Sequence, residues 1–258
     1  RRIEIRKEVI DRLLPDMPPV LTGIPIVYDN QAQILYAGAT TDKQTDALSI
    51  AIRETIERNI IPVTPATAAL ERKQVNEKDI EPTSFSPEVE DSLAGGTLGH
   101  DFLTWLWFYS ETSGGFVNTE RGKFAAAIQD PVVFIMEGEG AHEIMLRKGS
   151  PLVSGEAKTA LLNGKKLALA RFLMARDDSQ WECSLEAGRF IFRGLKFPKG
   201  QILDPISKFQ ERMLFLETFR EGFFGFFDLF LEKRSSAAEW KNVQKEIHKW
   251  VTSRAAKR

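Results

Sequence analysis

The sequence has few residues of the kinds that build metal or redox sites. Among its 258 residues are one cysteine, Cys183, and three histidines that lie far apart. A single cysteine allows neither an internal disulfide nor a thiolate zinc site, and such scarcity favours a cytoplasmic location. The histidines show no ligand spacing. The sequence therefore predicts no bound metal and no cofactor.

The sequence also has almost no net charge and contains no long uncharged apolar run. With 35 basic and 36 acidic residues the formal net charge is −1, so any affinity for nucleic acid must come from uneven placement of charge. The most apolar region, residues 209–231, carries six charged side chains. A bilayer span needs about 18 or more nearly uncharged residues. We therefore expect a soluble helix there and no membrane partner.

Signatures of catalysis are weak. The glycine-rich stretch at residues 95–99 precedes a helix but lacks the Lys-Ser/Thr of a phosphate-binding loop, so it is interpreted as a hinge. Four acids that could hold Mg²⁺ for a nuclease are Asp130, Glu137, Glu139 and Glu143. No Glu-x-Lys follows them on the strand, and a solvated hairpin tip explains them equally well. The sequence predicts a protein that is not an enzyme, with a metal-dependent nuclease as the alternative.

The most distinctive segment is Leu98–Glu111, which crowds seven large apolar side chains into eight positions. Leu98, Phe102, Trp105 and Tyr109 recur at helical spacing and form one apolar stripe. The preceding Gly95 and Gly96 and the following glycines at 114–115 bound the helix. We expect a central core helix here, with a base-stacking platform as the less favoured interpretation.

Patterns along the chain predict an α+β fold of antiparallel sheets with packed helices. Residues 1–73 are expected to form a helix (5–14), a hairpin (strands 24–28 and 33–37), a helix (42–58) and a returning strand (60–63). Residues 74–97 contain prolines and acids without periodicity and are expected to be a linker or surface loop. Residues 98–258 are expected to form a second α+β domain.

Within this second domain the aromatic helix is followed by alternating strand patterns. Expected strands are 124–128, 132–137, 143–147, 167–175, 181–185 and 189–192. A short helix at 154–162 has Ser154 as its N-cap, and two helices follow at 205–233 and about 236–253. The expected buried side of the longer helix consists of Ile206, Phe209, Met213, Leu216, Phe223, Phe227 and Phe230.

A basic segment stands out in this neutral chain. Residues 147–199 contain eleven basic and five acidic residues, a net charge of +6. Arg189 and Arg193 lie an even number of residues apart and are expected on one sheet face, with Phe190 and Phe192 on the other. Such a face could contact a phosphate backbone, and an ordinary solvated sheet face remains an equal alternative. A second basic feature is the row Lys241, Lys245 and Lys249, which recurs every fourth residue on the last helix.

Three patches resemble the recombination-associated protein RdgC family. The first runs from Val9 to Thr64 and contains VIDRLLP and IIPVTP, the second is FLTWLWF, and the third runs from Ser154 to Phe197 and contains ALLNGKKLALARF and FRGLKF. The resemblance implies a bacterial, nucleoid-associated protein that binds double-stranded DNA without sequence preference. It also implies a ring-shaped homodimer with DNA in a basic hole and antagonism of RecA-dependent recombination.

Residue by residue, the resemblance is thin. Gly164 and Lys165 match the family's Gly-Lys before a long strand, and residues 193–197 match its basic-x-Leu-Lys-Phe ending. Asp16, Met17 and Pro18 replace a basic residue and a phenylalanine that the family uses in DNA contact and ring closure. The family's N-terminal strands precede the first residue of this sequence, so that part of the fold is expected to be absent.

We therefore expect a DNA-binding protein of the RdgC type, with a nuclease and a protein-interaction module without DNA affinity as alternatives. The expected DNA-facing surface is the strand pair 165–176 and 189–199. The predicted DNA-binding residues are Lys165, Lys166, Arg171, Arg176, Arg189, Arg193, Lys196 and Lys199.

Overall fold

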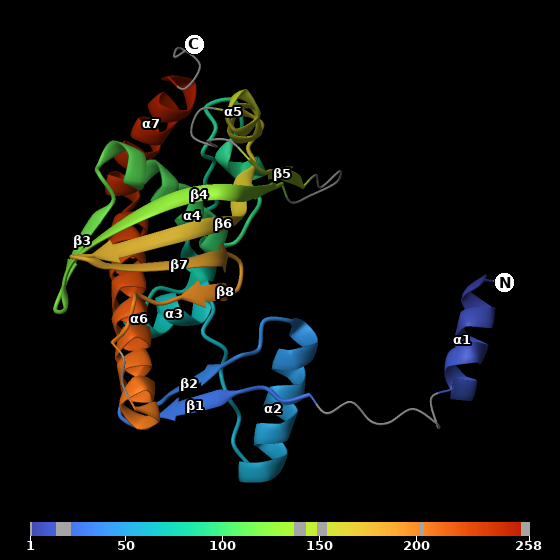
Figure 1. The fold of residues 1–258 in the computed structure, drawn as a ribbon. Helices are drawn as coiled ribbons and strands as arrows, with labels where there is room; N and C mark the ends of the chain where they lie inside the picture. The colour runs from blue at the N-terminus through green and yellow to red at the C-terminus, as the bar shows by residue number, and fades with distance from the viewer. Residues whose placement is uncertain (1, 14–21, 137–142, 149–153, 202–203, 254–258) are drawn as a thin grey trace. The chain divides into compact units, whose positions relative to one another are not determined.

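The computed structural model describes residues 2–13, 22–136, 143–148, 154–201 and 204–253 (Figure 1). The chain forms two compact units, residues 1–60 and 61–258. This division lies thirteen residues before the boundary at 73 that the sequence patterns suggest, because the segment after residue 60 contacts the second unit. The two units are described separately.

Unit 1 contains the helix α1 (Arg2–Leu13), the strands β1 (Ile26–Asp29) and β2 (Ile34–Ala37), and the helix α2 (Asp42–Ile56). The hairpin is antiparallel, and the Asp29 carboxylate closes its turn by accepting hydrogen bonds from two backbone N–H groups. Thr41 and Gln44 form a capping box at the start of α2. The predicted hairpin and helices are confirmed.

The predicted strand at residues 60–63 is wrong. These residues have no strand pairing and lead directly into the helix α3 (Pro65–Lys73), which belongs to unit 2. Thr64 caps α3 through a capping box with Thr67, and Pro65 occupies the first helical turn. The sequence Thr-Pro-Ala-Thr therefore carried a helix-start signal that outweighs the β-branched residues before it.

Unit 2 is built on a six-stranded antiparallel sheet. Its strands are β3 (Phe116–Thr119), β4 (Gly122–Ile135), β5 (Ile144–Leu146), β6 (Lys166–Arg176), β7 (Ser179–Glu186) and β8 (Ile191–Lys196). The order across the sheet is β3-β4-β6-β7-β8, and β5 pairs with part of β4. The predicted fold class, α+β with antiparallel sheets and packed helices, is confirmed.

Two strand predictions need correction. The segments expected as separate strands at 124–128 and 132–137 form the single strand β4, whose register with β6 shifts between Gln129 and Val132. The last strand begins at Ile191, so Arg189 lies in the turn before it. Phe190 in that turn has a φ of 53°, and its ring is still buried against α6, as expected for its side of the sheet.

The described helices of unit 2 cover one face of its sheet and leave the other face uncovered (Figure 1). They are α4 (Leu98–Thr112), α6 (Pro205–Ser235) and α7 (Ala237–Ser253), with α5 (Gly155–Leu162) at one end of the sheet. Ser154 caps α5 by accepting a hydrogen bond from the Ala157 N–H. The predicted helices at 98–111, 154–162 and 236–253 agree with these bounds.

The helix α4 is the centre of the core, as predicted. Every residue from Leu98 to Phe108 is buried. The Phe102 ring contacts five aromatic rings, of which one lies on α4 itself, three lie on α6 and one precedes β8. Trp105 is 2% exposed and stacks on Tyr109 at a centroid distance of 4.9 Å. Trp105 is therefore core and not an open stacking platform.

Close backbone approach fixes the position of α4. A Cβ atom at Gly99 would lie 2.0 Å from the Ala187 carbonyl oxygen, so only glycine allows the first turn of α4 to pack on the turn after β7. The structure therefore gives Gly99 a packing role.

Two other expectations about packing are wrong. The segment 74–97 is irregular, as predicted, but it belongs to unit 2, and its residues Thr83–Ser86 are buried. It contains the short 3-10 helices η2 (Glu77–Asp79) and η3 (Asp91–Leu93). The buried side of α6 begins only at Thr218, while Ile206 and Phe209 at its start are exposed. The apolar stripe of α6 thus extends beyond the surface that the sheet covers.

Candidate nucleic-acid interface

The alternation of β6 separates its basic residues into two groups. Phe172 and Met174 point toward the helix layer and are fully buried. Because successive side chains alternate between faces, Arg176 shares this inner face, whereas Arg171 points to the outer face. The strand therefore contributes one of its predicted cations to the surface that the helices leave uncovered.

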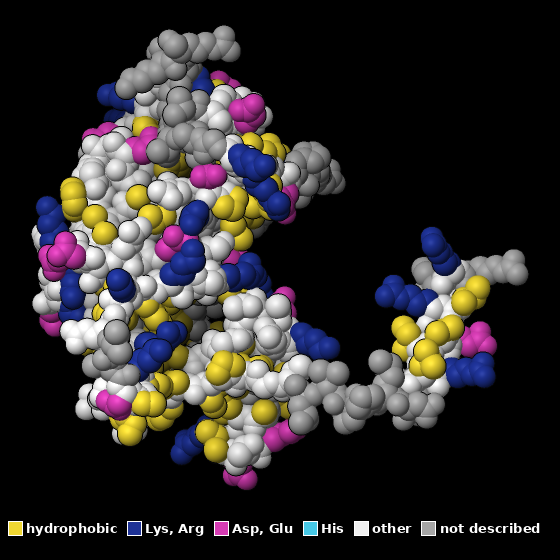
Figure 2. Space-filling model, in the orientation of Figure 1, with side chains coloured by type: hydrophobic (Ala, Val, Ile, Leu, Met, Phe, Trp, Pro, Cys, Tyr) yellow, Lys and Arg dark blue, Asp and Glu magenta, His cyan; other side chains and the backbone are white. Residues whose placement is uncertain are grey.

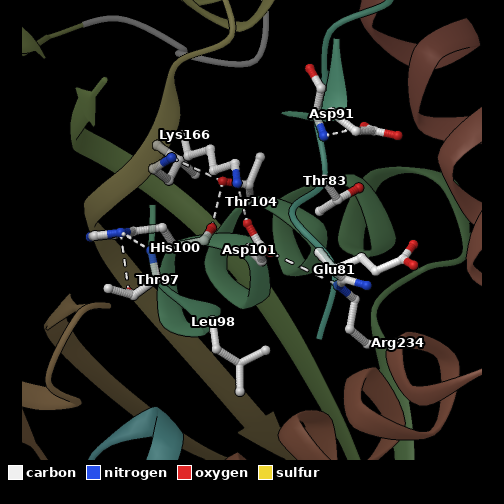
Figure 3. A network of polar contacts seen from close by, with 12 residues as sticks. Glu81, Thr83, Asp91, Thr97, Leu98, His100, Asp101, Thr104, Lys166 and Arg234 are labelled. Atoms are coloured by element: carbon white, nitrogen blue, oxygen red, sulfur yellow. Dashed lines mark hydrogen bonds and ion pairs between the residues drawn. The ribbon is translucent and has the colours of Figure 1, made fainter. Parts of the chain in front are cut away.

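Lys166 lies in the interior, where it forms an ionic network (Figure 3). Its ammonium lies 2.5 Å from the Asp101 carboxylate of α4, and the Arg234 guanidinium of α6 lies 3.9 Å from the same carboxylate. Arg234 also donates to the Glu81 carbonyl oxygen. Lys165 is buried as well. Burial removes Lys165 and Lys166 from the predicted DNA surface.

Burial dominates the electrostatics of this network. Desolvation raises the pKa of Asp101 above its ordinary value, against the opposing effect of Lys166 and Arg234. Desolvation also lowers the pKa of Arg234, although the Asp101 charge opposes this shift. The three charges connect α4, β6 and α6 inside the unit, which is a structural role.

The N-terminus of α4 is occupied by protein groups. The Leu98 N–H donates to the Glu77 carboxylate at 2.8 Å, and the Thr97 N–H donates to Nδ1 of His100 at 3.0 Å. A bound phosphate would need these N–H groups, but in this structure they already donate to protein groups that cap the helix. The interpretation of this stretch as something other than a phosphate site fits these contacts.

The outer face of β6, β7 and β8 carries two carboxylates, each between two cations. Arg171 of β6, Ser184 of β7 and Arg193 of β8 are register partners and form one row across the sheet. Glu182 accepts hydrogen bonds from Arg171 at 2.5 Å and from Lys196 at 2.9 Å. These bonds, first that of Lys196 and then that of Arg171, lower the pKa of Glu182.

Glu186 forms the second cluster on this face. It accepts from Arg189 at 2.8 Å and from Arg193 at 2.5 Å. Four cations thus surround two carboxylates, which leaves a net charge of +2. In Figure 1 the strands lie in front of α4 and α6, and Figure 2, in the same orientation, shows basic and acidic side chains interspersed on the molecule. We name Arg171, Arg189, Arg193 and Lys196 the sheet cations.

The remaining two predicted residues lie apart from the sheet cations. Arg176 donates to the Arg121 carbonyl oxygen at 3.2 Å, and its guanidinium lies 5.7 Å from the centre of the Phe124 ring. It therefore packs at the edge of the inner face. Lys199 follows β8 and is exposed. The structure brings together four of the eight predicted residues.

The row of lysines on α7 is also exposed. Lys241, Lys245 and Lys249 all lie at the surface, while Trp240, Ile247, Trp250 and Val251 of the same helix are buried. The periodicity of the sequence predicted this division of α7.

The acids of the nuclease alternative are only partly described. Asp130 lies in β4 and Glu143 just before β5, whereas Glu137 and Glu139 lie outside the described residues. In the parts of the chain that the structure describes, no group of three or more His, Cys, Asp or Glu could hold a metal ion. Nor do those parts include a helix long and apolar enough to cross a membrane. Asp16, Met17 and Pro18 also lie outside the described residues.

Comparisons with known proteins identify no relative. No family model matches the sequence, and no curated protein or solved structure is significantly similar to it.

Proposed function

We propose that this protein binds double-stranded DNA without sequence preference through the outer face of β6, β7 and β8. The observation that carries the proposal is the group of sheet cations, four basic side chains held at fixed positions around Glu182 and Glu186 on the outer face of the described sheet. Phosphate contacts of this kind position a protein on DNA without reading bases. The family resemblance in the sequence supports the same function.

The pairing of the sheet cations is compatible with phosphate binding. A guanidinium has five N–H donors, and Arg193 uses one N–H to reach Glu186 in the bond described above. The Glu186 carboxylate holds this side chain in place at the surface of the sheet, where a phosphate could approach it. Arg193 and Lys196 are 40% and 68% exposed in their side chains, so both are accessible.

The proposal extends to the assembly and the cellular role that the RdgC resemblance implies. In that form the protein is a homodimer that closes a ring around DNA, associates with the nucleoid in the cytoplasm and restrains RecA-dependent recombination. The motifs VIDRLLP, FLTWLWF and FRGLKF support this part of the proposal.

A gel-shift assay with labelled duplex and Mg²⁺ tests the function. We expect retention of the duplex without cleavage. Cleavage that EDTA abolishes would instead support the nuclease alternative, and absence of retention would support a protein-interaction module.

Charge reversal on the sheet tests the surface. We expect Arg193→Glu with Lys196→Glu to weaken binding to all duplexes alike, and to reduce the slope of log affinity against log salt by about one unit for each lost phosphate contact. The fold should survive, because exposed ion pairs contribute at most about 1 kcal/mol each. Binding isotherms at several salt concentrations and a thermal melt provide the measurement.

Lys43→Glu with Lys208→Glu is the matched control, since it changes the charge equally at exposed positions of α2 and α6. If the control and the sheet variant weaken binding equally, net charge and not the sheet surface determines affinity. Unchanged affinity of the sheet variant would place the DNA surface elsewhere.

A further inference from the structure

The helix α7 is fixed to the core along one side. Trp240 donates to the Thr83 hydroxyl at 2.9 Å, and Trp250 donates to the Glu111 carboxylate at 2.8 Å. The Trp250 ring also packs edge-on against Trp107 of α4 at 5.1 Å. These contacts hold the orientation of α7, so the side chains of its opposite side occupy a fixed arc.

That arc carries Lys241, Lys245 and Lys249. At about 100° per residue the three side chains cover roughly 80° of the helix, and each step of four residues advances about 6 Å along the axis. None of the three ammonium groups has an ion pair or hydrogen-bond partner within the portion of the chain that the structure describes. We name these three residues the lysine row.

The acids of α7 lie beside this row and not within it. Glu239 pairs with Lys233 of α6 at 3.5 Å, and Glu246 lies further round the helix, about 60° beyond Lys249. In the sequence, residues 254–258 add three basic residues and no acid after α7. The lysine row therefore differs from the sheet cations, which have carboxylate partners.

The surroundings of the lysine row indicate which partner it fits. A membrane-surface helix needs an exposed apolar side, but the apolar side of α7 is buried in the core. A protein interface has an apolar centre, whereas the exposed residues of α7 between 238 and 249 are polar or charged apart from Ala238. A polyanion that is bound by charge alone requires neither feature.

We propose that the lysine row is a phosphate-contacting surface for double-stranded DNA, separate from the sheet cations. The proposal rests on the DNA-binding function proposed above and names a second site for it. DNA phosphates release their condensed counterions when the lysine row binds them. The affinity of this contact should therefore fall as the salt concentration rises.

Removal of the row is the direct test. Lys241→Gln with Lys245→Gln and Lys249→Gln should weaken duplex binding at least tenfold at about 0.1 M salt and reduce the log-log salt slope by about 0.9 for each lost contact. The matched control is Lys43→Gln with Lys78→Gln and Lys208→Gln, which removes the same charge from exposed positions of α2, η2 and α6. A thermal melt should show the row variant folded like the parent.

The outcomes separate this inference from the proposed function. If the parent protein fails to retain duplex, the proposed function fails. If the parent binds duplex and the sheet variant binds more weakly but the row variant does not, the proposed function stands and the DNA-contacting role of the lysine row is overturned. If only the row variant binds duplex more weakly, the role of the lysine row stands and the role of the sheet cations is overturned. An equal loss of affinity in the row variant and its control also overturns the role of the lysine row.

A cross-linking experiment locates the contact directly. Cys183 is buried, and burial raises its pKa to about 12, so an introduced surface cysteine is the reactive thiol. Lys245→Cys carrying a photoreactive maleimide should cross-link to bound duplex on irradiation, and Lys208→Cys should not. Cross-linking at both positions or at neither would overturn the assignment.

Discussion

In unit 2, carboxylates face pairs of cations in two different environments. In the interior, one carboxylate, Asp101, faces Lys166 and Arg234, and all three side chains are at most 8% exposed. On the outer face, Glu182 and Glu186 each face two cations, with side chains 22–68% exposed. The distances are similar, between 2.5 and 2.9 Å for the closest contacts. Burial, and not geometry, distinguishes the two sets.

This difference determines what each set can do. Removing charges from water costs several kcal/mol for each ion, so a buried network is stable only while every charge keeps its partner. Exposed pairs keep their hydration and contribute about 0–1 kcal/mol. We infer that the interior network holds α4, β6 and α6 together, whereas the outer pairs can exchange partners with a ligand at little cost to the fold.

The largest expected effect is in the interior. Asp101→Asn keeps the shape of the side chain but leaves Lys166 and Arg234 as buried cations without a counter-charge. We expect a loss of roughly 3–5 kcal/mol in the free energy of unfolding. Urea denaturation of parent and variant, with attention to the midpoint, measures this loss.

The matched variant on the outer face is Glu182→Gln, which also leaves two cations without their carboxylate. Because these groups are solvated, we expect a change of about 1 kcal/mol or less. Equal losses in Asp101→Asn and Glu182→Gln would contradict the distinction between the two environments.

The sequence alone contained enough information to predict part of this arrangement of buried and exposed residues. The alternation of β6 places Arg176 on the same face as Phe172 and Met174, so this predicted DNA-binding residue could have been excluded by period alone. Lys166 could not, because the register of β6 with β4 shifts between Leu167 and Leu169 and breaks the alternation. The core role of α4 followed from its apolar stripe. The helix α3 was missed because the residues before Thr64 resemble a strand, although the capping box was present.

The partners of the charges could not be predicted. Asp101 and Lys166 are 65 residues apart in sequence, and their contact depends on how α4 packs on β6. Glu182 meets Lys196 because of the shifted register between β7 and β8. Such pairings depend on strand register and helix packing, which no local pattern specifies.

An intermediate effect concerns DNA affinity. Glu186→Gln removes the carboxylate that faces Arg189 and Arg193 and raises the net charge of the outer face by one. If this face contacts phosphates, we expect tighter duplex binding, by a few-fold at about 0.1 M salt, and a steeper salt dependence. Binding isotherms at several salt concentrations test this expectation.

The matched control for Glu186→Gln is Glu232→Gln on α6, which also removes one acid from an ion pair, with Lys73. An equal gain in affinity for both variants would show that net charge alone is responsible. A loss of affinity in Glu186→Gln would indicate that the carboxylate positions the arginines and is needed for binding.

The smallest expected effect is the pH dependence of the Glu182 pairs. Lys196 and Arg171 lower the pKa of Glu182 in the folded protein, so the folded state holds a proton on this carboxylate less tightly than the unfolded chain does. The stabilisation is therefore present above the ordinary glutamate pKa of about 4.3 and is lost as pH falls through the lowered folded value. We expect the stability difference between the parent and Glu182→Gln to be present at pH 7 and to shrink below about pH 4. Thermal melts of both proteins across this range provide the measurement, and a difference that stays constant down to pH 3 would show that the Glu182 charge is not its source.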